Sequence, residues 1–509
     1  MPTRHNCITA ALFTGVLLST VTNAQWSDDA TVNTLVSGAL TNCVITHTAA
    51  APDGGVWIAW YDASAGYDVI VQRLDSAGVP VFAQPIIVQD QSLSWVQDFD
   101  LATVGNDCAL AWADGTVIGA ALVSANGSIA WQHNLQDGNG YQANAQVCGA
   151  NDDFTVVAWA DEDVTKVQRI GTDGTLVWDT PVSIGGNGFF LASDIKPASD
   201  HDVVVSMVQY LSFNGAKVLK AQRIRADGSL AWGTQPVDVF TQGSLQYGNY
   251  PECIADDSGG AVFTWYSSSN LQSYVQWIDG DGVKLFGVQG VSVATSGNLL
   301  HTGPSACYDQ GADEVTVFCT RQSANQAEDG VQVNRFGRNG LAIWGAAGIE
   351  LDALTGAAAV LDLQAIQLGP LATVSWLKLA VTGQGTVRGQ AINAPGAIQW
   401  GAAPIGLGEP NLGRNDLTGA VAGDLLVAVW SDARDGFNRV YAQSLDAEGV
   451  LGPAGCIADI TGDEMVGVDD LLDLIAAWGL SGSPADVNGD GVVDTLDLLL
   501  ILAGWGACP

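Results

Sequence analysis

A short strand-like run that ends in an aromatic or sulfur-containing residue recurs along most of this 509-residue chain. Six copies, among them VWIAW, CALAW and LVAVW, end in tryptophan: Trp60, Trp112, Trp159, Trp265, Trp376 and Trp430. Two more copies, VVVSM and VTVFC, carry Met207 and Cys319 at this position. A second strand-like run and a glycine turn follow each copy, as in VQRLDSAG and VQRIGTDG. A repeat of this kind restricts the chain to a stacked or circular architecture.

The turn glycines form a regular series with a spacing of 47 to 58 residues: Gly78, Gly127, Gly174, Gly228, Gly282, Gly340, Gly396 and Gly449. In seven copies an aromatic residue follows four positions later: Phe82, Trp131, Trp178, Trp232, Phe286, Trp344 and Trp400. The eighth copy continues as VLGP, but QWSDDATVNTLV near the N-terminus resembles the missing segment, such as VWDTPVSI. We therefore expect the first residues of the mature chain to supply the outer strand of the last repeat.

Each copy offers about four short alternating strands separated by Gly, Asp and Asn turns, which is typical of a β-propeller blade. The sequence predicts an all-β propeller over residues 25–453, with eight blades, or seven if one copy is misaligned, closed by the N-terminal strand. A β-solenoid is the weaker alternative, because it needs no such strand. The repeats resemble those of secreted bacterial β-propeller proteins. One aromatic side chain per blade is expected to pack one sheet against the next.

The charge and the N-terminus limit where this chain can act. It holds 54 acidic and only 18 basic residues, with a net charge of -36. Nucleic acid and anionic membranes are poor partners for such a surface, whereas cations are natural ones. Residues 1–24 read as a signal peptide, with an apolar run followed by small residues, and no later run is long enough to span a membrane. We expect a secreted or cell-surface protein without a membrane span.

Eight cysteines remain after the leader, and export permits disulfides among them. Cys307 and Cys319 flank an expected hairpin, and Cys456 and Cys508 bracket the C-terminal segment, so these are the two candidate pairs. Cys148 and Cys253 are expected to be small buried residues.

Two polar positions recur in the blades. Arg73, Arg169, Arg223 and Arg335 share one strand position, for which we expect structural ion pairs or hydrogen bonds. Asp62, Asp114, Asp161 and Asp432 form Trp-x-Asp motifs, whose carboxylates can accept backbone N–H groups and fix the next turn, or form a rim that holds a cation or a sugar. The connections after these aspartates vary most in length and are the expected binding loops. No catalytic motif or organic cofactor site is present in the sequence, so no catalytic residue is predicted.

The segment DVNGDGVVDTLD has the spacing of a calcium-binding loop. Oxygen ligands at alternate positions wrap a hard cation, and a glycine at the sixth position permits the sharp turn. The predicted ligands are the side chains of Asp486, Asn488, Asp490, Asp494 and Asp497 and the carbonyl of Val492. A second copy begins 27 residues earlier, with ligands from Asp459, Thr461, Asp463, Asp470 and the Met465 carbonyl. Because Glu464 replaces the glycine, we expect weaker Ca²⁺ binding there.

Each loop is followed by one apolar helix-like run, LLDLIAAWG or LLLILAGWG. This doubled pattern resembles the type I dockerin modules of secreted bacterial proteins over residues 454–509. The resemblance implies two EF-hand-type calcium loops, a fold that depends on Ca²⁺, and docking to a cohesin-like or cell-surface protein. The tenth and eleventh loop positions, Val468-Asp469 and Thr495-Leu496, depart from the common Ser-Thr of that family.

These features predict an exported, non-catalytic binding or display propeller with a calcium-dependent docking module, and a polysaccharide is one expected ligand. One alternative is a polysaccharide-degrading enzyme, either a glycoside hydrolase or a polysaccharide lyase, that carries a dockerin-like tail. A structural envelope protein is the other. Buried carboxylates with raised pKa values in a channel would favour the enzyme.

Overall fold

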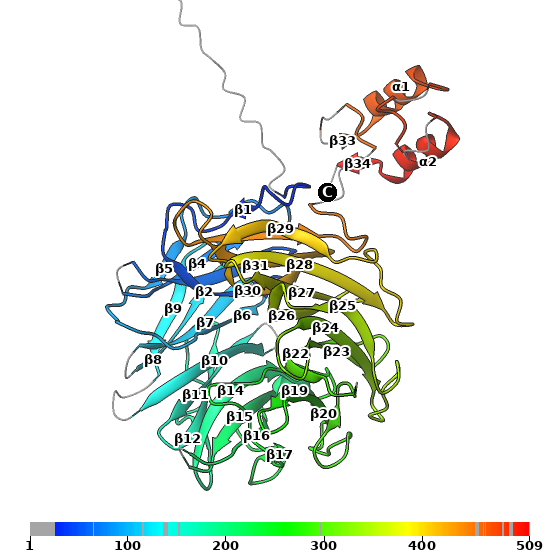
Figure 1. The fold of residues 1–509 in the computed structure, drawn as a ribbon. Helices are drawn as coiled ribbons and strands as arrows, with labels where there is room; N and C mark the ends of the chain where they lie inside the picture. Colours follow the sequence, from blue (N-terminus) through cyan, green and yellow to red (C-terminus); the bar gives the residue numbers. More distant parts are fainter. Residues whose placement is uncertain are drawn as a thin grey trace, which may run out of the picture.

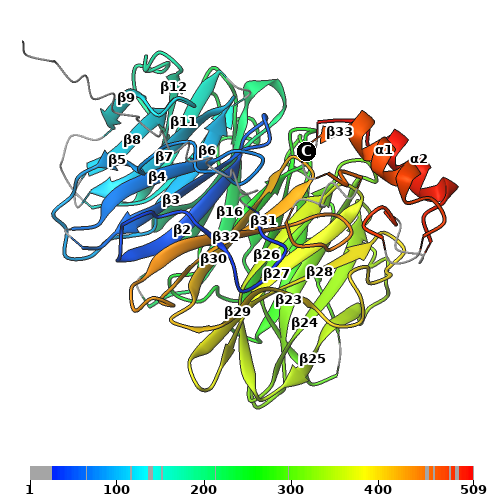
Figure 2. The ribbon, with the colours of Figure 1, turned by 90° about the horizontal axis from the view of Figure 1, so that it is seen from above.

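The structure is a computed structural model that describes residues 26–509, apart from residues 65, 115–116, 136–140, 151–152, 213, 296, 453–457, 462, 464, 481–482, 488–491 and 508–509. The predicted signal peptide lies outside the described residues. Eight four-stranded antiparallel sheets form a ring, and a small module with two helices follows them along the chain (Figures 1 and 2). The chain is therefore an all-β propeller, as the repeat predicted.

Each blade is a meander whose first strand lies innermost. Blades 1 to 4 comprise β2 (Cys43–Ala50), β3 (Val56–Asp62), β4 (Asp68–Leu74) and β5 (Ile86–Gln89); β6 (Asp100–Val104), β7 (Asp107–Asp114), β8 (Val117–Val123) and β9 (Ile129–Asn134); β10 (Gln142–Ala150), β11 (Phe154–Asp161), β12 (Val164–Gly171) and β13 (Val182–Ile184); and β14 (Phe189–Pro197), β15 (Val203–Tyr210), β16 (Lys217–Ile224) and β17 (Val237–Phe240), with the 3₁₀ turn η1 (Ser199–His201).

Blades 5 to 8 repeat this order. They comprise β18 (Cys253–Ala255), β19 (Ala261–Ser267), β20 (Gln272–Ile278) and β21 (Val291–Ser292); β22 (Leu300–Asp309), β23 (Glu314–Gln322), β24 (Asp329–Gly337) and β25 (Ile349–Thr355); β26 (Ala358–Leu368), β27 (Leu371–Ala380), β28 (Gln384–Asn393) and β29 (Ile405–Leu412); and β30 (Asn415–Ala422), β31 (Leu425–Asp432), β32 (Arg439–Leu445) and β1 (Thr34–Leu35).

Strand β1 closes the ring, because the outer strand of blade 8 comes from the start of the chain. Thr34 pairs with Ala442 and Leu35 with Tyr441 in an antiparallel register. The predicted closure is confirmed, and the seven-blade and solenoid alternatives are wrong. A closed ring leaves no blade without neighbours on both sides.

The glycine turns join each blade to the one before it. All eight turn glycines have φ between 72° and 91°, a conformation that glycine adopts without strain. A Cβ at each of them would meet a side chain of the preceding blade, such as Phe82 at Gly127 or Trp400 at Gly449. At Gly78 that side chain is Trp26, which is buried and donates its indole N–H to the carbonyl of Ser76 at 3.1 Å. Trp26 is thus the aromatic residue that the eighth repeat lacks.

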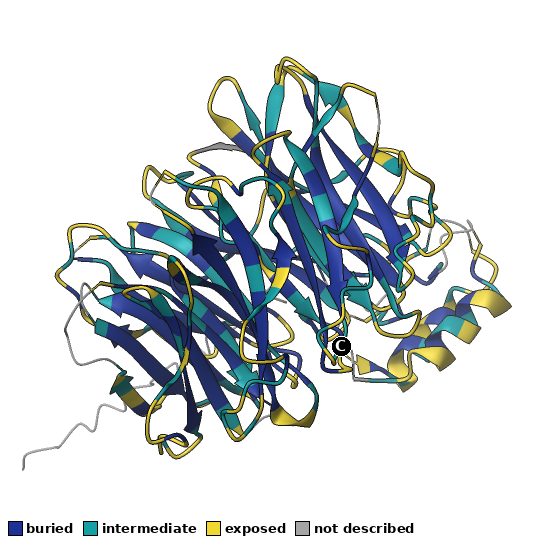
Figure 3. Ribbon diagram, turned by 90° about the horizontal axis from the view of Figure 1, so that it is seen from below, coloured by how far each residue is buried: buried dark blue, intermediate teal, exposed yellow. Residues whose placement is uncertain are grey.

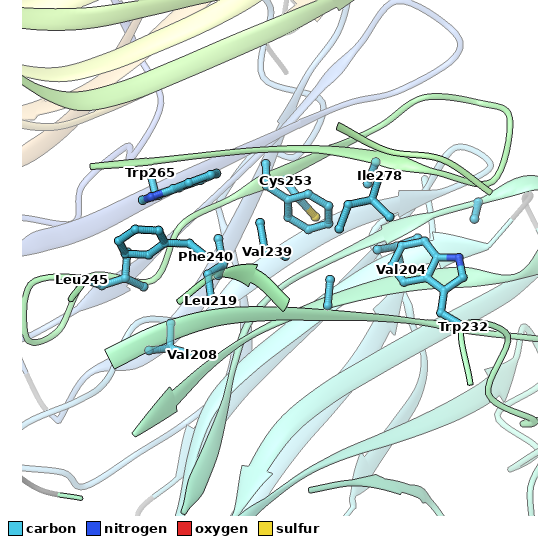
Figure 4. Close-up of a cluster of buried hydrophobic side chains, with 14 of the residues drawn as sticks. Val204, Val208, Leu219, Trp232, Val239, Phe240, Leu245, Cys253, Trp265 and Ile278 are labelled. Carbon is cyan, nitrogen blue, oxygen red and sulfur yellow. The ribbon is translucent and has the colours of Figure 1, made fainter. Parts of the chain in front are cut away.

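The core is divided among the junctions between blades, since each sheet is buried on both faces (Figure 3). Between blades 4 and 5, Val208, Leu219 and Phe240 pack against Trp265, and Trp232 lies near Ile278 (Figure 4). The tryptophans that end the repeated strand are all buried in such junctions. This explains why the repeat keeps a large side chain there.

The recurrent arginines are structural, as expected. Arg73 pairs with Asp53, and the Arg223 guanidinium donates to Asp202 at 2.8 Å. Arg335 pairs with Asp309 at 2.7 Å and with Glu314 at 2.5 Å. These contacts fix the hairpins beside the glycine turns.

Two of the four Trp-x-Asp motifs, those of Asp62 and Asp432, cap strand ends in the structural sense predicted. Asp62 accepts the backbone N–H of Ser64 at 3.0 Å, and Asp432 accepts that of Arg434 at 3.2 Å. Asp161 instead accepts the side-chain amide of Gln142 and pairs with Lys166.

The predicted disulfide between Cys307 and Cys319 is wrong, because both thiols are free and buried. Cys307 lies opposite Thr316, three residues from Cys319, so the two side chains point to opposite faces of the sheet. They belong to different core clusters. Cys148 and Cys253 are small buried residues, as expected. Cys456 and Cys508 lie outside the described residues.

The C-terminal module contains α1 (Val468–Ala476), α2 (Thr495–Ala503) and the short ribbon of β33 (Met465–Val466) with β34 (Gly506–Ala507). Its core follows the 27-residue repeat, with Leu474 and Ile501 as equivalent, fully buried side chains. None of the helices that the structure describes is long and apolar enough to cross a membrane.

Candidate functional site

The inner strands bend toward the centre of the ring through β-bulges. The pairing register shifts in β2, β10, β14, β22, β26 and β30. Residues at these bulges, such as Ile45, Asn144 and Asp416, have φ between 52° and 55°. A bulge turns the next side chain out of the regular alternation and is common beside binding sites.

One polar residue in each blade follows at an equivalent position. In seven blades it pairs with the residue that precedes the repeated Trp, or Met207 or Cys319 in its place, and in blade 5 Glu252 directly precedes β18. We call these eight residues the inner ring: His47, Asp100, Gln146, Asp194, Glu252, Ser305, Gln364 and Thr418. Ionisable members occupy blades 1, 2, 4 and 5, whereas blades 6 to 8 carry Ser, Gln and Thr. We call these four ionisable residues, His47, Asp100, Asp194 and Glu252, the charged arc of the inner ring.

Three inner-ring residues also brace the neighbouring blade. The carboxylate of Asp100 accepts the backbone N–H of Val147 at 2.9 Å, and that of Asp194 accepts the N–H of Cys253 at 2.7 Å. Ser305 does the same in blade 6, where its hydroxyl oxygen accepts the N–H of Ala365 at 3.0 Å. Because the neutral Ser305 makes the same contact in blade 6, this contact does not require the negative charges of Asp100 and Asp194.

The charged arc lines a cavity of about 370 Å³, here called the channel pocket. His47 and Asp98 form a pair at 2.7 Å, and Lys196 donates to Asp194 at 2.9 Å. The carboxylate of Glu252 faces the pocket, and no described residue forms a hydrogen bond with it. Both cations of the pocket are thus paired, while carboxylates remain in excess.

Enclosure by the blades changes the ionisation of these groups. Burial raises the pKa of Asp100 to about 7, against the opposing influence of Lys196. Burial likewise raises the pKa of Glu252. Burial alone would lower the pKa of His47, but Asp98, Asp100 and Glu252 raise it to about 9. The Asp98–His47 pair is therefore ionised near neutral pH, and Asp100 is poised between its two forms.

A second and wider cavity of about 750 Å³, the aromatic cleft, adjoins the channel pocket. It is lined by Tyr141, Glu162, Asp163, Phe189, Leu191, Tyr210, Tyr247 and Tyr250. Tyr141 and Tyr247 have 56% and 66% of their surface exposed, respectively, which is unusual for residues that ordinarily bury their rings.

The two cavities are adjacent, because Tyr141 and Tyr250 line both. Burial and a hydrogen bond with Tyr210 raise the pKa of Tyr250, so its hydroxyl keeps its proton and can donate. A ligand in the cleft would rest on aromatic rings and extend its polar groups toward the charged arc.

The aromatic cleft lies on the face of the ring where the Trp-x-Asp motifs end. Glu162 and Asp163 form the turn directly after Asp161, which is one of the connections predicted as binding loops. The sequence did not identify the tyrosines or the inner ring. The one signal available was register, since in seven blades the inner-ring residue lies opposite the residue before the repeated Trp or its replacement.

The first predicted calcium loop brings three of its carboxylates together. Oxygen atoms of Asp459, Asp463 and Asp470 all lie within 4.8 Å of one another. Thr461 lies in the same cluster, where its backbone N–H donates to Asp470 at 2.9 Å. Backbone donors from Gly467 and Thr461 outweigh burial and lower the pKa of Asp470 to about 2. The Met465 side chain is exposed, and its residue forms part of β33.

The second loop is described only in part, since Asn488 and Asp490 lie outside the described residues. Asp494 caps α2 by accepting the N–H of Leu496 at 2.7 Å. Asp497 is fully buried and accepts the N–H of Asp494 at 2.7 Å, as Asp470 does from Gly467. Asp486 is partly buried, and Val492 follows the undescribed stretch. The described half thus repeats the geometry of the first loop.

Both helices of the module also present apolar side chains to solvent. Three pairs of equivalent residues, 27 positions apart, are 47% to 56% exposed: Leu472 and Leu499, Ile475 and Leu502, and Trp478 and Trp505. We call this set the apolar stripe. Exposed apolar surface is common at sites of interaction with other proteins.

The sequence matches no protein-family model and no curated protein. Among solved structures, the propeller of Dos1 is 12% identical, with a TM-score of 0.42, and the match covers 80% of this chain and 93% of that one. An ulvan lyase, a polysaccharide lyase, is 9% identical with a TM-score of 0.41, covering 81% and 96%. An α-L-arabinofuranosidase from Clostridium thermocellum is 14% identical with a TM-score of 0.31, covering 48% and 93%. Some structural neighbours thus act on polysaccharides, but similarity at this level concerns the fold alone.

Proposed function

We propose that this protein is exported, that its propeller binds a carbohydrate chain in the aromatic cleft and channel pocket, and that its C-terminal module attaches it to a partner through Ca²⁺. The observation that carries the first part is the position of an exposed tyrosine-lined cleft adjacent to a polar pocket. Pyranose rings present apolar C–H faces that stack on aromatic rings, and their hydroxyl groups hydrogen-bond to convergent polar side chains.

Binding of soluble oligosaccharides, measured by calorimetry, tests this proposal. Tyr247→Ala removes an exposed ring of the cleft and should weaken binding about tenfold, consistent with the loss of one stacking contact of about 1.4 kcal/mol. Phe437→Ala is the matched control, because Phe437 is similarly exposed at 52% but lies on blade 8. Equal affinity of both variants and the wild type would show that the cleft is not the site.

Catalysis is the second candidate, and the raised pKa values of Asp100 and Glu252 favour it. Binding is preferred because both oxygens of Asp100 already accept backbone N–H groups, from Leu101 at 2.8 Å and from Val147 at 2.9 Å. A carboxylate held in this way is poorly placed to transfer protons. New reducing ends or unsaturated products in the same binding reactions would reverse this preference.

The proposed Ca²⁺ binding rests on the donor set of the C-terminal module. Clustered carboxylate oxygens, with Asp470 buried among backbone donors, match the preference of Ca²⁺ for hard oxygen ligands. The ion would supply charge neutralisation and cross-link the loop to the first turn of α1. Asp459, Thr461, Asp463, Asp470 and the Met465 carbonyl would hold it in the first loop, and the equivalent residues in the second.

The apolar stripe is the proposed docking surface, and its occupant a cohesin-like protein outside the cell. Duplication of the same three exposed side chains on both helices, without a core function, supports this assignment. Leu472→Glu combined with Leu499→Glu should abolish capture of the partner while the calcium-dependent helical signal remains. Retained capture, or capture that resists chelation of Ca²⁺, would contradict the docking proposal.

A further inference from the structure

The charge of the combined cavity restricts what kind of carbohydrate it can hold. Six carboxylates line the two cavities: Asp98, Asp100, Glu162, Asp163, Asp194 and Glu252. Only His47 and Lys196 among the lining residues carry positive charge, and each is already paired with its own aspartate. An anionic sugar chain would meet more acidic than basic side chains in both cavities.

The aromatic rings of the cleft favour a cation in addition to a sugar face. The ammonium of Lys217 lies over the ring of Tyr210 at 5.3 Å and over that of Tyr247 at 5.6 Å. Lys217 is not among the residues that line the cavity. Its position shows that the electron-rich faces attract an ammonium group.

Glu252 stands where the cleft meets the channel pocket. Tyr250, two residues earlier, lines both cavities, and the Glu252 carboxylate faces the pocket with no hydrogen bond from a described residue. The brace that Asp194 forms to Cys253 holds the backbone at this point. Glu252 thus places a carboxylate with no hydrogen-bonded counter-ion where the aromatic cleft meets the channel pocket.

We propose that the ligand is a cationic amino-sugar chain, with its sugar rings on the tyrosines and its ammonium groups at Glu252 and the cleft carboxylates. This inference rests on the proposed carbohydrate-binding function and specifies the ligand of that same site. It excludes uronic-acid and sulfated chains, whose charge has the wrong sign.

Two oligomers of equal length provide a matched test, because glucosamine and N-acetylglucosamine chains differ in the charge of one nitrogen substituent. In mildly acidic buffer, where the amines are protonated, the full-length protein should bind the glucosamine oligomer at least tenfold more tightly. The preference should shrink as salt is added, because screening weakens charge pairing. An oligomer of uronic acid should not bind.

Glu252→Gln should lose most of the preference for glucosamine, because it removes the charge of the carboxylate and keeps the shape of the side chain. Glu448→Gln is the control, because Glu448 is an exposed acid in a turn of blade 8, outside both cavities. Equal affinities for the two oligomers, or a preference for the uronic-acid chain, would overturn the inference while leaving carbohydrate binding intact. Failure of all three oligomers to bind would overturn the proposed function itself.

Discussion

The closure of the ring by non-covalent contacts makes Trp26 a sensitive position. The four strands of every other blade form one continuous stretch of chain, whereas blade 8 is completed by the non-covalent pairing of β1 with β32. Trp26 is 3% exposed, packs on Gly78 and donates to the Ser76 carbonyl. Trp26→Ala therefore removes a buried indole and leaves the Ser76 carbonyl without its donor.

Truncation of a buried tryptophan costs about 3–5 kcal/mol, and the lost hydrogen bond adds about 1 kcal/mol. The expected loss of about 4–6 kcal/mol is a large part of the 5–15 kcal/mol typical of a whole domain. Denaturant unfolding, followed by tryptophan fluorescence and far-ultraviolet circular dichroism, measures it. Hydrogen exchange should also accelerate in β1 and β32, since their pairing depends on this anchor.

Trp400→Ala is the control for this experiment. Trp400 is 7% exposed, lies against Gly449 and donates to the Ala447 carbonyl at 2.9 Å, but it belongs to blade 7, whose four strands form one continuous stretch of chain. Its replacement should cost a similar free energy without accelerating exchange in β1. A loss below about 1 kcal/mol for Trp26→Ala, or identical exchange patterns in the two variants, would refute the reasoning.

Three further outcomes are expected. Chelation of Ca²⁺ should remove the helical circular dichroism signal and leave the β-signal, and a helical signal unchanged by chelation would contradict this expectation. Asp470→Asn should weaken Ca²⁺ binding as measured by calorimetry. The imidazole of His47 should titrate near pH 9 by NMR and at a lower pH in Asp98→Asn, because Asp98 raises its pKa. Since this pKa is raised, the pair stabilises the fold fully below pH 6.5 and loses this contribution as the pH rises through about 9. Arg335→Ala should lower the free energy of unfolding by about 3–5 kcal/mol, since it leaves two partner carboxylates unpaired, whereas the more exposed Arg338→Ala should cost less.

The propeller could be predicted from the sequence because its determinants repeat with a period. Gly78 and its seven equivalents need one backbone conformation, and each must meet an aromatic ring, so the same letters recur at the same spacing. The absence of the aromatic residue from the eighth repeat was also informative, because Trp26 near the N-terminus supplies it. The pairing of Cys307 with Cys319 failed because sequence proximity in a hairpin does not reveal which face each residue takes.

The binding site could not be predicted, because its members share a position and not a residue type. His47, Gln146 and Glu252 occupy equivalent places in three blades, yet no alignment of letters connects them. Tyr141 and Tyr247 come from different inter-blade connections and approach each other only when the ring forms. A motif search cannot detect such a site, whereas the pairing register of the strands in the structure reveals it.

The antiparallel meander places the two groups of residues at opposite rims of the ring. The glycine turns follow the third strand of each blade. Trp26, Trp400 and the other aromatic residues pack on these turns. The tyrosines and acids of the cleft follow the second strand or precede the first. Mutations on the cleft rim can therefore accumulate without weakening the contacts between glycine turns and aromatic side chains on the other rim. A scaffold divided in this way can exchange one ligand for another over evolutionary time by replacing connections alone, while selection for foldability acts on a different set of codons.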